Sequence, residues 1–153
     1  GGGDLFPDPT LLWRPYPSMI DGIERPPFVL DHGLWHGVLH LIVLAPDSGR
    51  RAYGIEIACE VYAAFEEMIY SVADHGGQGG AYDGGVYIKE AERSALLTGF
   101  AAIDPFGRKP RHFSFVGGDY CYEVLGFGEP IIQAFASPEE ANDWGRARSK
   151  RDA

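Results

Sequence analysis

The chain lacks several features that would place it in a membrane, in an oxidising compartment or among the metal-binding proteins. No apolar run approaches the roughly 20 residues that a membrane-spanning helix needs, since the longest, Val38 to Ala45, is interrupted by His40. The first residues show neither the basic nor the apolar region of a secretory signal. Only Cys59 and Cys121 are present, without CxxC spacing. We therefore expect two reduced core thiols in a bacterial-type cytoplasm, although one bridge is possible if their strands are adjacent.

Motifs of common enzymes are missing as well. The glycine-rich stretch Gly76 to Gly85 fits neither the phosphate-binding pattern GxxxxGK[ST] nor GxGxxG between a strand and a helix. There is no GxSxG elbow for a serine nucleophile. Cys59 and Cys121 lie in apolar, strand-like contexts, where a thiol is usually inert. The sequence thus favours a non-enzymatic protein without a cofactor or metal, and leaves an enzymatic function uncertain.

Basic residues are also scarce. Thirteen Lys and Arg stand against 22 Asp and Glu, which gives a net charge of −9, and several of the basic ones gather after Arg146. The rest of the chain is therefore still more acidic than the total indicates. An acidic body repels phosphate backbones and attracts cations, so the charge disfavours nucleic acid and favours a basic protein partner. Acidity that serves only to prevent aggregation is the alternative.

The 153 residues suit one domain. From Asp4 to Pro27 the chain is rich in proline, which fixes φ and removes backbone donors, so residues 1–27 are expected to wrap the body without regular structure. Residues 28–153 would then form the domain itself. In this part, two apolar stretches flank the turn-like residues APDSGR. They predict an antiparallel hairpin in which 34–45 pairs with 50–59, with Tyr53, Ile55, Ile57 and Cys59 on its buried face.

Two helices are predicted after this hairpin. Val61, Phe65, Met68, Ile69 and Val72 follow helical spacing before the glycine pair at 76 and 77. A short strand-like VYI then leads into KEAERSALLTGFAAI, where Ala91, Ala95, Leu96 and Phe100 indicate a second amphipathic helix.

The last third of the chain predicts strands again, at Arg111 to Val116, Tyr120 to Gly126 and Ile131 to Phe135, with a Gly-Gly-Asp turn after the first. A final helix begins with Ser137 as N-cap, Pro138 at the first helical position and Glu140 at the capping-box position. The order is two strands, two helices, three strands and one helix, without βαβ alternation. This order predicts a single α+β domain with an antiparallel sheet and helices packed on it.

Three histidines, His32, His36 and His40, recur at intervals of four in DHGLWHGVLHLIVL. The glycines between them and the β-branched residues after them favour a strand. Residues four apart in a strand are about 13 Å from each other, so these side chains cannot share one metal ion. A catalytic role would instead pair His36 or His40 with a carboxylate of the neighbouring strand, such as Glu56. The structural alternative is that these histidines are half-buried strand residues with hydrogen-bond partners.

The segment RHFSFVGGDYCYEVLGFGEPII, from Arg111 to Ile132, resembles the closing strand pair of small bacterial immunity-type proteins, acidic domains that neutralise a cognate toxin. The likeness consists of an aromatic strand, a Gly-Asp turn, a Glu-Val-Leu strand and a Pro-Ile close. It implies a toxin-neutralising role without catalysis, and it transfers no binding residues.

We therefore predict an acidic binding or inhibitory protein that neutralises a basic toxin domain. Exposed acids and an aromatic residue near flexible backbone suit such recognition, and the predicted contacts are Asp74, Tyr82, Asp83, Asp104 and Asp119. The glycine-rich stretch that holds Tyr82 and Asp83 is expected to border this surface. One alternative is a small hydrolase or metal-dependent enzyme that uses His36 or His40 with Glu56. Another is an accessory domain of a longer chain, which the absence of an initial Met suggests.

Overall fold

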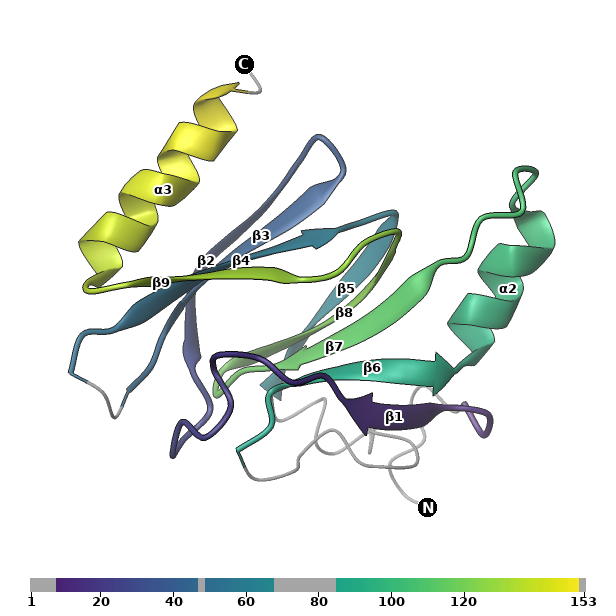
Figure 1. Ribbon diagram of the computed structural model, residues 1–153, viewed down its shortest axis with the longest axis horizontal. Helices are drawn as coiled ribbons and strands as arrows, with labels where there is room; N and C mark the ends of the chain where they lie inside the picture. The colour runs from purple at the N-terminus through teal and green to yellow at the C-terminus, as the bar shows by residue number, and fades with distance from the viewer. Residues whose placement is uncertain (1–7, 47–48, 68–84, 152–153) are drawn as a thin grey trace.

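The computed structural model describes residues 8–46, 49–67 and 85–151, which form two antiparallel sheets and two helices (Figure 1). Sheet A contains, in spatial order, β1 (Leu12–Pro15), β6 (Ile88–Arg93), β7 (Arg111–Val116), β8 (Tyr120–Gly126) and β5 (Val61–Glu66). Sheet B contains β2 (Phe28–Trp35), β3 (Val38–Leu44), β4 (Ala52–Ala58) and β9 (Ile131–Phe135). The helices are α2 (Ala95–Ile103) and α3 (Pro138–Arg151).

The main core lies between the two sheets. Alternate residues of a strand point to opposite faces, so every second residue of the central strands contributes to one apolar layer. The buried residues of this layer come from both sheets: Leu39, Leu41, Val43, Tyr53, Ile55 and Ile57 of sheet B, and Ile88, Phe113, Phe115, Tyr122 and Val124 of sheet A. The predicted buried face at Tyr53, Ile55 and Ile57 is confirmed.

The chain changes sheets between β1 and β2, between β4 and β5, and between β8 and β9. The second and third passages are in contact, because Glu60 N–H donates to the Leu125 carbonyl at 2.7 Å. A Cβ added at Gly126 would overlap the Ala58 carbonyl, so only glycine allows the strands to approach this closely. This contact fixes how the two sheets are joined.

The predicted α+β class with one sheet is wrong, because the described residues are mainly strand and form two sheets. The helix predicted from Val61 and Phe65 begins as β5, which pairs with β8. Residues four apart lie on one face of a helix and also on one face of a strand, so this spacing did not separate the two. Met68, Ile69 and Val72 lie outside the described residues.

The helix predicted over KEAERSALLTGFAAI is only partly right. Its first third, Lys89 to Arg93, belongs to the strand β6, and α2 begins at Ala95 after Ser94, the N-cap. Lys89 and Glu90 are good helix formers, but both are buried in a strand between β1 and β7. Glu90 is held there by Arg14 and Arg111, and the hydrogen bonds from Arg111 lower the pKa of its carboxyl. Tertiary contacts therefore override local propensity in this segment.

The predictions for the last third are confirmed. The strands Arg111–Val116, Tyr120–Gly126 and Ile131–Phe135 occur with those bounds. The final helix begins at Pro138, and the predicted N-cap is present because Glu140 N–H donates to Ser137 Oγ at 3.2 Å. The Glu140 carboxylate accepts from Ala136 N–H at 3.2 Å, one residue before the N-cap whose N–H a capping box uses.

The proline-rich segment does contain regular structure, since β1 pairs with β6 at the edge of sheet A. Leu11 and Trp13 anchor it by packing against Ala91. No helix among the described residues is long and apolar enough to cross a membrane.

Candidate functional site

The structure separates the three histidines of DHGLWHGVLHLIVL. His36 and Gly37 both have positive φ, at 49° and 73°, and form the turn between β2 and β3, so the predicted single strand from residue 34 is two strands. His32 reaches the core side, where the Tyr122 hydroxyl lies 3.0 Å from its Nδ1. His40 points to the opposite face of sheet B, towards α3. The three side chains therefore occupy separate environments.

His40 and Glu56 are opposite one another on β3 and β4, with His40 Nε2 3.5 Å from the carboxylate. The other carboxylate oxygen accepts from Arg148 of α3 at 2.7 Å. His40 is 5% exposed and lies against the rings of Trp35 and Trp144. This arrangement ties α3 to sheet B, and it does not include His36.

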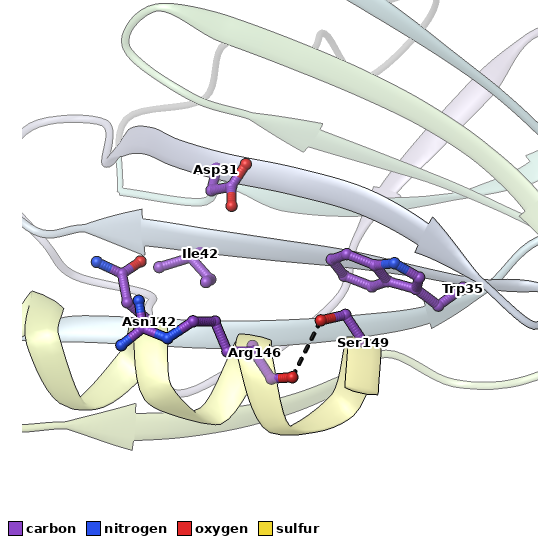
Figure 2. Close-up of a pocket in the computed structure, with 7 residues that line it drawn as sticks. Asp31, Trp35, Ile42, Asn142, Arg146 and Ser149 are labelled. Atoms are coloured by element: carbon purple, nitrogen blue, oxygen red, sulfur yellow. Dashed lines mark hydrogen bonds between the residues drawn. The ribbon is translucent and has the colours of Figure 1, made fainter. Parts of the chain in front are cut away.

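A small cleft of about 110 Å³ lies beside this cluster, between β2, β3 and α3 (Figure 2). Its lining residues are Asp31, Trp35, Ile42, Asn142, Gly145, Arg146 and Ser149. Neither His40 nor Glu56 lines the cleft, and Ser149 Oγ donates to the backbone carbonyl of Arg146 at 3.0 Å. The cleft therefore gives the predicted His40 and Glu56 pair no access to a substrate.

A second polar cluster lies on the outer face of sheet A. Ser94 Oγ is 2.9 Å from His112 Nδ1, and His112 Nε2 is 2.7 Å from Glu123 Oε1. All three side chains are buried, with Ser94 only 1% exposed. A hydroxyl, an imidazole and a carboxylate in sequence form the arrangement that activates serine nucleophiles. Ser94 Oγ also accepts from Leu97 N–H at 3.1 Å, as the N-cap of α2 must.

This cluster was not predicted from the sequence, although the sequence contains part of the signal for it. In the hairpin predicted at 111–126, the turn at 117–119 sets a register that places Ser114 opposite Glu123, so His112 and Glu123 lie diagonally. The N-cap signal of Ser94 before an apolar run was also present. It was hidden because the predicted helix included β6.

The surface of α2 is unusual. Its nine residues, ALLTGFAAI, include no charged side chain, and none of them is buried. Ile103 is 77% exposed, and Phe106 in the loop after the helix is 78% exposed. An apolar helix in a globular protein normally faces the core or another surface. We call Leu96, Leu97, Phe100, Ile103 and Phe106 the α2 surface.

A shallow cleft of about 360 Å³ runs along α2, and we call it the α2 cleft. α2 contributes Leu97, Thr98 and Ala101, of which Leu97 also belongs to the α2 surface. Its cationic residues are Arg93, Arg108 and Lys109. Arg108 is paired with Asp104 at 3.2 Å and lies 4.2 Å from the ring centroid of Phe127. Lys109 has no ion-pair partner among the described residues.

Of the predicted partner contacts, Asp104 and Asp119 are described, and both serve turns. The Asp104 carboxylate accepts hydrogen bonds from the side chain and the backbone N–H of Arg108. The bond from the Arg108 side chain lowers the pKa of the Asp104 carboxyl. Asp119 accepts from the backbone N–H groups of Val29 and Tyr120. Asp74, Tyr82 and Asp83 lie outside the described residues, as does most of the glycine-rich stretch.

Cys59 and Cys121 are both buried and are not joined by a disulfide. Burial raises the pKa of the Cys59 thiol to about 11, which disfavours the thiolate that a nucleophile needs. Among the described residues, no group of three or more His, Cys, Asp or Glu side chains could hold a metal ion.

These features define a small, mainly β domain with two sheets, one closely packed helix and one exposed apolar helix. Comparison with protein-family models, curated proteins and solved structures gave no match. The resemblance of Arg111 to Ile132 to immunity-type proteins therefore stays a prediction.

Proposed function

We propose that this chain is a non-enzymatic binding domain that engages another protein through the α2 surface. The observation that supports this function is that α2, an uncharged and mostly apolar helix, buries none of its residues. Burying an apolar side chain such as Ile103 contributes about 1.5–3 kcal/mol, and here this contribution is left unused in the isolated chain. A partner that covers α2 would recover it.

Neutralisation of a toxin domain is the specific form of this proposal that the sequence resemblance suggests. The basic partner predicted from the net charge of −9 also stays a prediction. Its test is the association rate, which must fall as salt increases if long-range attraction steers the encounter. A rate that does not change with salt would argue against a basic partner.

Photo-crosslinking tests the binding surface directly. A photoreactive amino acid at position 103 or 106 should form an adduct with one protein in the source cells, while the same group at Glu139 on α3 should not. The captured protein, once purified, should bind the chain, and Ile103→Asp should weaken that binding at least about tenfold. Ile131, which is 64% exposed on β9, provides the matched control, because Ile131→Asp introduces the same charge elsewhere. Equal losses from both variants would reject the α2 surface as the binding site.

A hydrolase with Ser94 as nucleophile is the second candidate, because Ser94, His112 and Glu123 are connected by hydrogen bonds and Ser94 lines the α2 cleft. His112 Nδ1 would accept the Ser94 proton, while Glu123 orients the ring through Nε2. This location replaces the predicted pair His40 and Glu56, which line neither of the two clefts described above. The low exposure of Ser94 and its capping bond to Leu97 are also fully explained by a structural role.

A fluorophosphonate probe, which reacts with activated serines, separates the two functions. A hydrolase should gain the mass of the probe, and Ser94→Asn, which preserves a capping side chain, should abolish the labelling while Ser149→Ala does not. Absence of labelling in the native chain would leave Ser94 with its structural role alone.

A further inference from the structure

We propose that the segment of the partner that occupies the α2 cleft is an amphipathic peptide stretch that carries carboxylates. This inference rests on the proposed binding function and adds the chemistry of its partner. The α2 cleft joins apolar groups of Leu97 and Ala101 to the cationic residues Arg93, Arg108 and Lys109. A ligand that matches both must present apolar side chains on one side and negative charges along the other.

The cationic side of the α2 cleft contrasts with the rest of the chain. The protein has 13 Lys and Arg against 22 Asp and Glu, yet three cations and a single carboxylate, that of Glu92, line the α2 cleft. The side chain of Arg93 donates to the uncharged backbone carbonyl of Thr10 at 3.0 Å, and Lys109 has no ion-pair partner among the described residues. Arg108 is compensated in part by Asp104. The Asp8 carboxylate accepts from Ala95 N–H at the start of α2 but does not line the cleft, so an anion in the α2 cleft would meet mainly Arg93 and Lys109.

Size decides between an acidic peptide and an anionic membrane. Exposed charges act over about 8–10 Å at physiological salt, so a narrow peptide responds mainly to the residues beside it. A membrane extends across the whole molecule and therefore meets the net charge of −9, which an anionic lipid surface repels. The concave shape of the α2 cleft also suits a chain better than a flat surface. A partner that is basic overall can still present such an acidic stretch.

Labelled helical peptides test the sign of the recognised charge. A set of peptides of about sixteen residues shares one apolar face and carries glutamate, glutamine or lysine on the other. Fluorescence anisotropy should show that the glutamate peptide binds at least about tenfold more tightly than the lysine peptide. Lys109→Glu should remove most of this preference and leave the affinity for the glutamine peptide within about twofold. Arg51→Glu is the control, because it makes the same change in net charge outside the α2 cleft.

Each other outcome overturns the inference. Equal affinity for the glutamate and lysine peptides would show that the α2 cleft does not distinguish the charge of its ligand. An effect of Arg51→Glu on this preference equal to that of Lys109→Glu would show the same. Stronger sedimentation with phosphatidylserine vesicles than binding to the glutamate peptide would assign the surface to a membrane. If crosslinking through position 103 succeeds while the glutamate peptide shows no preference, only the charge inference fails. Failure of crosslinking at positions 103 and 106 removes the proposed function itself.

Discussion

The helices α2 and α3 differ in composition and in burial: the charged helix packs against a sheet, and the apolar helix is exposed. Half of the fourteen residues of α3 are charged, yet the helix packs closely against sheet B. Ala141 is fully buried there, and the Trp144 ring lies directly over Gly54. α2 has no charged residue and buries none of its nine. Figure 1 shows α3 along sheet B and α2 beside the end of β6 and the start of β7.

The difference teaches that a complementary surface, more than apolar composition, decides whether a helix packs. α3 succeeds because small residues on both sides allow close approach, with Gly145 against Ile42 and Gly54 against Trp144. Arg148 then pairs with Glu56 at the interface. α2 makes fewer such contacts: Leu97 packs half-buried against Leu11, Trp13 and Ala91, and the Phe100 ring lies 5.6 Å from that of Phe127. Leu96 and Ile103 are exposed and therefore available to a partner, and variants of the two helices should respond differently.

The largest expected effect is the loss of the Trp144 ring. Trp144→Ala removes the contacts of α3 with Gly54, His40 and Phe135, and we expect it to lower the free energy of unfolding by about 3 kcal/mol. Urea denaturation measures this change. A loss below about 1 kcal/mol would show that α3 is held mainly by its polar contacts.

A double-mutant cycle makes this prediction specific to the packing. A Cβ added at Gly54 would lie 2.5 Å from the Trp144 ring, so Gly54→Ala should also destabilise the chain. Once Trp144 is alanine the added methyl group no longer overlaps the ring. The two losses should therefore sum to more than the loss of the double variant, and simple additivity would contradict the close contact.

The N-caps provide an intermediate effect. Ser137→Ala removes one capping bond at an exposed helix start and should cost about 1 kcal/mol. Ser94→Ala removes a cap and also a buried bond to His112, so we expect a loss of about 2 kcal/mol. Ser94→Asn, which can still cap α2, should recover part of this loss. Equal costs for the two alanine variants would show that the bond to His112 contributes little.

Local signals allowed the last third of the fold to be predicted. A turn is marked by Gly117, Gly118 and Asp119, so the strands β7 and β8 on either side of it were predicted with their bounds. A helix start is marked by Ser137 with Glu140, so the start of α3 was predicted as well. Local signals do not show how the strands are divided between the two sheets. This division depends on long-range pairings such as β1 with β6, which join parts of the chain far apart in sequence.

The candidate sites also divide into those that could be predicted from the sequence and those that could not. His40 beside Glu56 followed from the predicted pairing of neighbouring strands. That His36 occupies a turn was missed, because a histidine with positive φ is an uncommon choice for such a position. The exposure of α2 could not be read from the sequence at all, since its apolar composition is what a buried helix would also show.

The smallest expected effect is the most informative for function. Ile103 is 77% exposed, and isoleucine and serine have similar helix propensities, so Ile103→Ser should change the free energy of unfolding by less than about 0.5 kcal/mol. Ala141→Ser on α3 is the matched comparison, because it places a hydroxyl at a fully buried helical position and should cost about 1 kcal/mol or more. If Ile103→Ser destabilises the chain as much as Ala141→Ser, α2 is packed in solution. The α2 surface would then be part of the fold, and the binding function would lose the observation that supports it.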